Sequence, residues 1–334
     1  MSSKNVLVLG ATGAMGRYLV PFLVDNGCRV TTVALDEPET VLPGVTHITA
    51  NGKDTAFISE LLERNFDGIV DFLSYKTAEL VKTLPRMLDH AGQYIFLSSG
   101  RVYANLECPV RETSPRLIDV SDDPLLLNSD DYCIHKARGE NIVRTYPSKD
   151  WTIVRPAITY SLMRSQLVTL EIDNTVGRAF AGKTVVLPEE ARNIQGTMSW
   201  AGDVAQMIAG LLFNEKARGE TFTVATAEHH TWGEIADYYR DICGLKAIWV
   251  PEADFLRAWV GPNHGFAPVW QLRYDRFFTR VMDNSKVLAA TGMKQENLKK
   301  LYDGLAYEIG RCPRDFPFKN NPFMDDYLKA KKIG

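Results

Sequence analysis

Short apolar runs alternate with amphipathic segments along the first half of the chain. The apolar runs are typical of strands, and the predicted strands cover 6–9, 29–35, 45–49, 68–73, 94–98 and 152–154. Between them apolar residues recur at helical spacing, which predicts helices over 15–24, 55–64, 78–90 and 132–144. Strand and helix in regular alternation indicate βαβ units and a parallel sheet that is buried on both faces.

A glycine-rich turn directly follows the first predicted strand, with glycines at three-residue spacing. This spacing suits a tight turn whose backbone approaches a pyrophosphate at the N-terminus of the next helix. A glycine-containing loop in another kind of α/β protein would look similar, but the position between strand and helix favours dinucleotide binding. The expected contacts are Gly10, Thr12, Gly13, Ala14, Met15 and Gly16.

The residue at the end of the second predicted strand bears on the choice between NAD and NADP. An acidic residue there binds the ribose hydroxyls of NAD, whereas a basic residue binds the phosphate of NADP. Asp36 lies 20 residues past Gly16, and no Arg or Lys occurs from 36 to 51. NAD is therefore the expected cofactor. Arg17 could reach a phosphate, so NADP is not excluded.

The rest of the chain is less regular. A helix over 201–213 and a strand over 221–225 are expected to return to the first sheet. The expected fold is therefore α/β, a Rossmann-type doubly wound parallel sheet with a smaller C-terminal substrate-binding lobe over its carboxyl edge. The expected division is a dinucleotide-binding domain of residues 1–158 joined by 196–226, and a lobe of residues 159–195 and 227–334.

Composition narrows the class of protein. The 334 residues are 45% hydrophobic and 24% charged, as in soluble globular proteins. With 38 basic and 41 acidic residues the net charge is −3, so no global basic field attracts nucleic acid or an anionic membrane. Five scattered cysteines without a C-x-x-C pair fit neither a disulfide framework nor a zinc site. We expect a cytoplasmic protein that binds a small molecule, with no metal, nucleic-acid or membrane partner.

Tyr132 and Lys136 stand four residues apart in a predicted helix and therefore share one face of it. An ammonium near a phenol stabilises the phenolate, which lets the tyrosine act as a general base toward an alcohol. The pair alone is a weak signal, because a surface lysine packed over a helical tyrosine looks the same. Its position adds weight, since Ser98 and Ser99 end a strand at the edge where ligands bind in open α/β sheets.

Together these motifs resemble the extended short-chain dehydrogenase/reductases, and among them the NAD-dependent epimerase/dehydratase group. The matching segments are GATGAMG, FLSSGRVYA, YCIHK followed by Glu140, TIVRPAITY, SWAGDVAQMI, TWGEIADYY and VMDNSKV. Their order and combination are specific for the fold and much less so for the substrate. The chain also resembles chloroplast stem-loop-binding proteins, which bind RNA on the same scaffold. Those members commonly lose the Tyr-x-x-x-Lys pair that this chain keeps.

The resemblance implies a catalytic set of Ser99, Tyr132 and Lys136. Tyr132 would take the proton of a sugar hydroxyl while hydride passes to nicotinamide, Lys136 would hold the nicotinamide ribose, and Ser99 would hydrogen-bond the reacting oxygen. Ser99 is preferred over Ser98 because it lies four residues before Tyr103. In an epimerase the keto-sugar turns over and hydride returns to its other face, so NAD is not consumed. The further cofactor contacts expected are Asp36, Asn51, Leu73 and Pro156, with Tyr132 and Lys136.

The resemblance also constrains the substrate. Sugar-nucleotide 4,6-dehydratases carry an Asp-Glu pair directly after the strand-end hydroxyl, where this chain has Gly100 and Arg101, so dehydration is disfavoured. Nucleotide-sugar epimerases keep a pyrophosphate-binding arginine ten residues before the Asp of a D-x-S-K segment; here Arg273 precedes Asp283 by ten. A guanidinium suits phosphate because its planar fork donates paired hydrogen bonds, although a surface ion pair is the alternative. The expected substrate contacts are Ser99, Arg101, Arg192 and Arg273.

The leading hypothesis is an NAD-dependent nucleotide-sugar epimerase, with UDP-hexose 4-epimerisation as its favoured form. One alternative is an NAD(P)-dependent reductase or dehydrogenase of a keto-sugar or another small carbonyl compound. The other is a non-catalytic protein that binds RNA or senses a dinucleotide. The resemblance further implies a homodimer formed through the helices near 78–90 and 132–144. The role of the polar segment 104–130 stays open.

Overall fold

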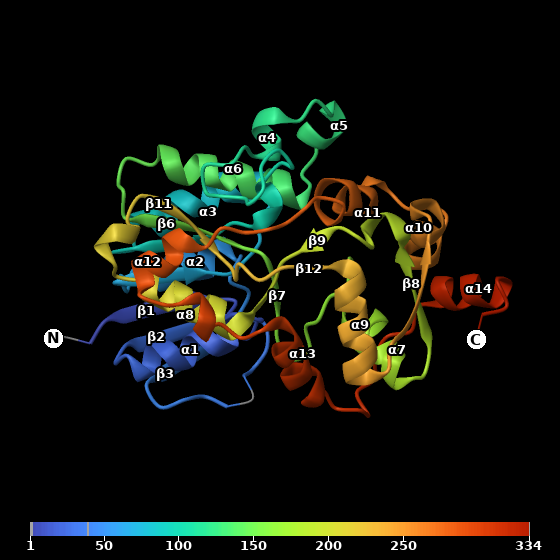
Figure 1. Ribbon diagram of the computed structural model, residues 1–334. Helices are drawn as coiled ribbons and strands as arrows, with labels where there is room; N and C mark the ends of the chain where they lie inside the picture. Colours follow the sequence, from blue (N-terminus) through green and yellow to red (C-terminus); the bar gives the residue numbers. More distant parts are fainter. Residues whose placement is uncertain (1–2, 39, 334) are drawn as a thin grey trace.

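The computed structural model describes residues 3–38 and 40–333. A parallel sheet lies at its centre, in the order β11-β6-β5-β4-β1-β2-β3 (Figure 1). The strands are β1 (Asn5–Leu9), β2 (Arg29–Ala34), β3 (Val45–Thr49), β4 (Gly68–Asp71), β5 (Tyr94–Leu97), β6 (Trp151–Pro156) and β11 (Glu220–Val224). The chain winds outward from β1 in both directions, which is the doubly wound Rossmann-type arrangement. The predicted fold class is confirmed.

Helices cover both faces of the sheet because consecutive residues of its strands, which point to opposite faces, are apolar. In β1, Val6 and Val8 pack on one side, while Leu7 and Leu9 pack on the other. The first side is covered by α1 (Gly16–Asp25), α8 (Ala201–Leu211) and α12 (Ser285–Thr291). The second side is covered by α2 (Thr55–Leu62), α3 (Thr77–Asp89) and α6 (Tyr132–Thr145). Both faces are therefore apolar, and polar ligands are left to the sheet edge.

A second hydrophobic core lies beyond the sheet, on the right of Figure 1. Around it pack α7 (Val176–Phe180), α9 (Trp232–Cys243), α10 (Glu252–Val260), α11 (Phe266–Gln271), α13 (Leu301–Gly310) and α14 (Pro322–Ala330), with β8 (Thr184–Pro188) paired to β13 (Lys246–Val250). Directly after α11 the segment Leu272–Arg276 forms a π-helical turn.

Short pairings connect this second core to the sheet. They are β7 (Ile158–Tyr160) with β10 (Met198–Trp200), and β9 (Gln195–Gly196) with β12 (His230–Thr231). Single 3₁₀ turns occur at Gly100–Val102, Ile172–Asn174, Glu189–Ala191, Glu215–Ala217 and Gln295–Asn297. The chain therefore leaves the sheet after β6 and returns to it through α8 and β11, while the exact division into two domains stays a prediction.

Most elements agree with the sequence predictions to within a few residues. The segment 104–130, for which the sequence predicted no element, is partly helical. It contains α4 (Leu117–Val120) and α5 (Pro124–Leu127), each only four residues long. Leu117 and Leu126 are buried against the first turns of α6. Helices this short depend on tertiary packing rather than on a periodic pattern, so the sequence does not reveal them.

The described part of the chain also bears on the expected partners. No helix within residues 3–38 and 40–333 combines the length and apolar character that a membrane crossing requires. The helices α3 and α6, through which a homodimer is expected, pack against each other on the same face of the sheet. The dimer itself stays a prediction.

Candidate active site

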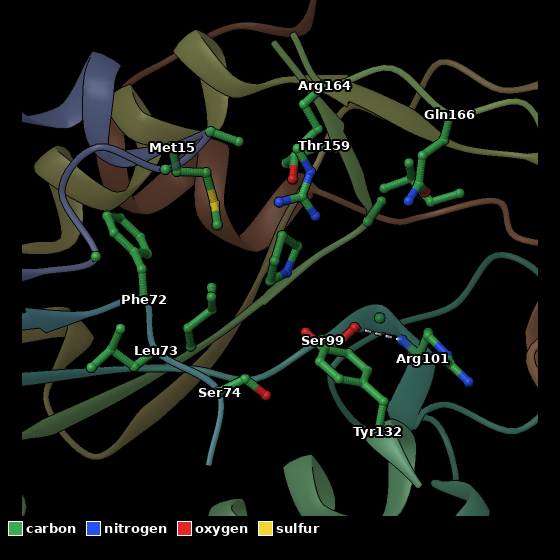
Figure 2. A pocket seen from close by; sticks show the side chains of 18 of the residues that line it. Met15, Phe72, Leu73, Ser74, Ser99, Arg101, Tyr132, Thr159, Arg164 and Gln166 are labelled. Carbon is green, nitrogen blue, oxygen red and sulfur yellow. Dashed lines mark hydrogen bonds between the residues drawn. The ribbon is translucent and has the colours of Figure 1, made fainter. Parts of the chain in front are cut away.

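A cavity of about 630 Å³ runs along the carboxyl ends of the strands, from the glycine-rich turn to the second core. Residues following β1, β2, β4, β5 and β6 line one part of it, and residues 159–166, 195–197 and 271–282 contribute to the rest. Figure 2 shows Met15, Phe72 and Leu73 on one side, and Ser99, Arg101 and Tyr132 on another. The cavity therefore has a cofactor end at the glycine turn and a substrate end at the second core.

The glycine turn adopts the geometry that its spacing predicts. Gly10 has φ +75°, a conformation that favours glycine, and its N–H donates to the carbonyl of Val33 at 2.8 Å. Gly16 begins α1 so close to the turn that an added Cβ would lie 2.3 Å from the carbonyl oxygen of Ala11. The N-terminus of α1 therefore opens directly onto the cavity. All six expected turn contacts line it: Gly10, Thr12, Gly13, Ala14, Met15 and Gly16.

Asp36 lies at the outer part of the cofactor end. Its Oδ1 accepts a hydrogen bond from the Thr12 hydroxyl at 2.7 Å, and the side chain is exposed to the cavity. Asn51, Leu73 and Pro156 also line the cavity. Arg17, which the sequence left open as a contact of an NADP phosphate, is not among the lining residues, although Lys53 is. An accepting carboxylate at this position suits the hydroxyls of a ribose.

Two adjacent serines have different surroundings at the end of β5. Ser98 is fully buried and donates to Glu140 at 2.5 Å, whereas Ser99 lines the cavity. The Ser99 oxygen accepts the backbone N–H of Arg101 at 3.2 Å, which begins a 3₁₀ turn. The hydroxyl that can meet a ligand is therefore that of Ser99.

Tyr132 is the first residue of α6 and lines the cavity beside Ser99 (Figure 2). The Lys136 ammonium lies 5.6 Å from the centre of the Tyr132 ring. It donates to the carbonyl of Leu97 at 2.7 Å and to that of Leu73 at 3.3 Å. Lys136 is only 2% exposed and is not itself a lining residue. A phenol, a hydroxyl and a nearby ammonium can together move a proton to or from a ligand oxygen.

Buried ion pairs hold α6 in position behind this group. Glu140, one turn beyond Lys136, accepts from Arg155 of β6 at 2.6 and 2.7 Å and from Arg116 at 3.0 Å. Burial would raise the pKa of the Glu140 carboxyl, but the Arg155 charge and hydrogen bonds hold it below its usual range. The carboxylate is therefore ionised at neutral pH, and it fixes the rotation of α6 against the sheet.

His135 provides a further contact that the sequence did not link to the site. Its ring packs edge-on against Tyr132, with 5.3 Å between ring centres, and its Nε2 lies 3.2 Å from the hydroxyl oxygen of Ser74, which lines the cavity. Burial lowers the pKa of His135, so the ring is neutral at pH 7. A neutral imidazole adds no charge beside the Tyr132 phenol, so the charges that act on this phenol come from the nearby cations.

Three arginines at the substrate end surround one carboxylate. Arg276 and Arg280 are nearly fully buried and, like Arg101 and Asp275, line the cavity. Arg276 forms an ion pair with Asp275, and the Nε atoms of Arg101 and Arg280 lie 3.6 and 3.5 Å from its oxygens. Burial lowers the pKa of both Arg276 and Arg280, but both guanidinium groups keep their charge at neutral pH. This end of the cavity is therefore strongly positive.

Two arginines expected to bind the substrate lie elsewhere. Arg273 is exposed on the far side of the π-helical turn, where it pairs with Glu252 at 2.9 Å. Arg192 pairs with Glu189 at 3.6 Å and stacks on Trp249. Neither lines the cavity, whereas Arg276 does. The cause is the packing of the π-helical turn Leu272–Arg276, which directs Arg276 toward Val168 and the cavity and Arg273 toward Glu252 on the surface.

The chain matches the description of the NAD dependent epimerase/dehydratase family over residues 6–225. It belongs to this family. The family is NAD-dependent, which agrees with the cofactor expected from Asp36 and the glycine turn. The matched range contains the sheet, Ser99, Tyr132 and Lys136, but not the arginine cluster at 276–280.

Solved structures similar to this chain have the same fold. The UDP-glucose 4-epimerase of Thermus thermophilus, in complex with NAD, is 18% identical, with 92% of this chain and 98% of that one covered at a TM-score of 0.67. The UDP-glucuronic acid 4-epimerase of Bacillus cereus, in complex with UDP-glucuronic acid and NAD, is 16% identical, with the same coverage and a TM-score of 0.68.

A further relative is named for RNA stem-loop binding and not for an enzymatic activity. The chloroplast stem-loop binding protein of 41 kDa b from Arabidopsis thaliana is 25% identical over 352 residues, which cover 99% of this chain and 86% of that protein. Similarity at this level extends along the chain but does not transfer an activity.

Proposed function

We propose that this protein is an NAD-dependent epimerase of a nucleotide sugar, of the UDP-hexose 4-epimerase type. One observation carries the proposal: a single cavity connects the glycine turn, the Ser99–Tyr132 pair and the arginine cluster. A dinucleotide, a reacting hydroxyl and a pyrophosphate are the three groups that these parts suit.

The residues at the cofactor end fit NAD. Gly16 lets α1 begin directly against the turn, because an added Cβ would lie 2.3 Å from the Ala11 carbonyl oxygen, and an anion is stabilised at the N-terminus of such a helix. The Asp36 carboxylate accepts hydrogen bonds from ribose hydroxyls, as it does from Thr12. Bound NAD supplies reversible hydride transfer. Leu73, Pro156 and Tyr132, which line the cavity, would hold the nicotinamide end of the cofactor.

The chain's own residues then handle the proton and the sugar. Tyr132 takes the proton from the sugar hydroxyl and later returns it, Lys136 stabilises the phenolate from behind, and Ser99 donates to the reacting oxygen. The keto-sugar turns over between the two hydride transfers, so the cofactor is regenerated. Gly100 and Arg101 offer no acid to expel water, so the product is an epimer rather than a dehydrated sugar.

The arginines at the substrate end hold the pyrophosphate. Arg276 and Arg280 form a buried positive wall, and Arg164 extends toward the cavity (Figure 2). The side chain of Arg164 is exposed. In this arrangement Arg276 takes the pyrophosphate-binding role that the sequence assigned to Arg273.

The proposal is tested by incubating the purified protein with NAD and single UDP-hexoses, and following the sugar by NMR and the nicotinamide by absorbance. We expect the two C4 epimers to interconvert while no NADH accumulates. Stoichiometric change of the nicotinamide would show a reductase or dehydrogenase instead. Absence of both signals across the UDP-hexoses would contradict the proposal.

RNA binding is a second candidate, because the similarity to the chloroplast stem-loop binding protein extends over 99% of this chain. A phosphate backbone is bound by exposed basic residues, whereas Arg276 and Arg280 are buried inside the cavity. Salt-sensitive binding of a stem-loop RNA by the wild-type protein, unaffected by excess UDP-sugar, would favour this candidate over the epimerase.

A further inference from the structure

A serine hydroxyl that the proposed reaction does not use lies where the two ends of the cavity meet. It belongs to Ser74, an exposed residue that lines the cavity. The segment that leads to it from β4 passes beside the glycine turn, since a Cβ added to Gly10 would lie 3.3 Å from Cβ of Phe72 and 3.4 Å from a methyl of Leu73. Figure 2 shows the Ser74 side chain between those of Leu73 and Tyr132. This segment therefore spans the distance from the glycine turn to the Tyr132 phenol.

The hydrogen bonds of His135 fix which of its two nitrogens carries the proton. Nδ1 lies 3.2 Å from the carbonyl oxygen of Asp130, which can only accept, so the hydrogen is on Nδ1. Burial, together with the charges of Lys136 and Lys76, lowers the pKa of His135 and keeps the ring neutral at pH 7. A neutral imidazole has one N–H, so Nε2 is an acceptor.

This tautomer determines what the Ser74 hydroxyl can offer a ligand. Its oxygen lies 3.2 Å from Nε2 of His135, and since Nε2 can only accept, the hydroxyl donates its proton to it. A serine hydroxyl has one proton and two lone pairs, so Ser74 presents lone pairs alone to the cavity. It therefore suits a hydrogen-bond donor on the ligand, and not a carboxylate, a carbonyl or a phosphate.

The order of the groups in NAD identifies the donor within reach. A pyrophosphate at the N-terminus of α1 and a nicotinamide beside Tyr132 would bring the intervening ribose to the segment that ends at Ser74. His135 connects the two residues, with 5.3 Å between its ring centre and that of Tyr132 and its hydrogen bond to Ser74. This ribose carries two hydroxyls, each able to donate. The carboxamide of NAD also donates, but it belongs to the ring that exchanges hydride with the sugar.

We propose that Ser74, oriented by His135, accepts a hydrogen bond from a hydroxyl of the nicotinamide ribose. Ser74 is the residue that contacts the cofactor, and His135 is a positioning residue that acts through it. A hydroxyl both donates and accepts, so it can bond to Ser74 and also to a donor, whereas a group without a proton cannot. The inference rests on the orientation of NAD in the proposed function, but not on the identity of the sugar or on the reaction.

The test measures by calorimetry the affinity of the cofactor-free protein for NAD and for two analogues, each lacking one hydroxyl of the nicotinamide ribose. We expect Ser74→Ala to weaken NAD binding about 3- to 10-fold, the effect of one neutral hydrogen bond. The analogue that lacks the bonded hydroxyl should bind the wild type and Ser74→Ala equally, because both changes remove the same interaction. Ser148→Ala, whose hydroxyl bonds Asp150 at 2.6 Å outside the cavity, is the matched control and should keep the wild-type affinities.

The role of His135 is tested in the same measurement. His135→Leu releases the Ser74 proton, so the hydroxyl is no longer held as an acceptor, and NAD binding should weaken by about 2- to 5-fold. The double variant should bind NAD as Ser74→Ala does, because His135 acts only through Ser74. His135→Gln should restore most of the affinity, since its amide oxygen can accept from Ser74.

The outcomes separate this inference from the proposed function. Equal NAD affinity of the wild type and Ser74→Ala, or a loss in Ser74→Ala that persists with both deoxyribose analogues, would overturn the inference even if UDP-hexoses are epimerised. A loss that disappears instead with an analogue carrying acetyl in place of the carboxamide would assign Ser74 to the amide and also overturn it. Losses that add in the double variant would exclude His135 as the positioning residue. The expected dependence on the ribose hydroxyl without any epimerisation would support the inference and contradict the proposed reaction. If His135→Leu does not fold, His135→Gln and Ser74→Ala decide.

Discussion

The two ends of the cavity are built in different ways. The cofactor end consists largely of residues 10–16 and Asp36, which are close in the sequence and act mainly through backbone and glycine geometry. The substrate end consists of charged side chains from Arg101, Arg164 and the segment 275–280, held by contacts between distant segments. The cofactor end needs little more than a strand, a tight turn and a helix that follow one another in the chain. The substrate end exists only when the whole chain is folded.

The difference implies different responses to mutation. At the cofactor end, a substitution changes the shape of a loop and the approach of the cofactor. At the substrate end, a substitution removes a charged side chain from a buried network of hydrogen bonds and ion pairs, so stability and ligand binding are lost together. Four variants test this contrast, from the largest expected effect to the smallest.

Arg276→Met should have the largest effect because it removes two buried hydrogen bonds from the π-helical turn to the segment 166–168, together with the ion pair with Asp275. We expect a loss of about 3–5 kcal/mol in the free energy of unfolding and weak UDP binding, with NAD affinity retained. Denaturant unfolding and calorimetry measure the two. Arg273→Gln is the control and should stay within about 0.5 kcal/mol of the wild type. An equal loss of NAD affinity in Arg276→Met would show that the two ends are not independent.

Tyr132→Phe acts where the two ends meet and should change only the reaction. Removal of the phenolic oxygen eliminates the proton carrier, so turnover of the UDP-sugar should fall by at least about 100-fold, equivalent to about 2.7 kcal/mol in the barrier. NAD binding and thermal stability should persist. Tyr302→Phe, on the exposed face of α13, is the matched control. A near-normal rate for Tyr132→Phe would exclude Tyr132 as the base.

Gly16→Ala tests the cofactor end alone. The added Cβ would lie 2.3 Å from the Ala11 carbonyl oxygen, so α1 must shift away from the turn. We expect NAD affinity to fall about 10-fold or more, while UDP still binds. Gly310→Ala serves as the control, because an added Cβ at the end of α13 meets no atom within 4 Å. Unchanged NAD affinity in Gly16→Ala would mean that the cofactor does not lie against this turn.

Asp203→Asn tests how the stability of the contact between α8 and the segment before α13 depends on pH. Asp203 in α8 accepts the backbone N–H of Lys299, just before α13, at 2.8 Å, and burial raises its pKa to about 6. The unfolded value is about 3.9, so the folded state binds the proton more tightly and loses this stabilisation as pH rises from 4 to 6.

The asparagine keeps the acceptor without the charge. Asp203→Asn should therefore be more stable than the wild type by up to about 2 kcal/mol at pH 8, with a smaller gain at pH 5. Thermal unfolding at the two pH values measures the difference. A gain that is the same at both values, or greater at pH 5, would contradict the raised pKa.

Much of the fold could be predicted from the sequence because it depends on local pattern. The apolar runs of β1, β4 and β5 indicate buried strands in any chain. A helix that starts at Gly16, close against the turn, requires a residue without a side chain there. The choice of Ser99 over Ser98 also agrees with their placement, since consecutive residues at a strand end face opposite directions.

Other features had no local signal. The helices α4 and α5 are too short for a periodic pattern, and they form because Leu117 and Leu126 pack against α6. The position of Lys136 beneath the cavity depends on the carbonyls of Leu97, the last residue of β5, and of Leu73, two residues beyond the end of β4. Only the assembled sheet brings those two acceptors together.

The sequence by itself determined the doubly wound sheet, the glycine turn, the acid at Asp36 and the Ser99–Tyr132–Lys136 group, because each depends on neighbouring residues or on the order of strands. Only the tertiary structure decided which arginines enter the cavity. Arg276 and Arg280 point inward and Arg273 outward because the π-helical turn packs against segments more than a hundred residues earlier in the chain. The direction of a long side chain in an irregular segment follows from such packing, and no local pattern encodes it.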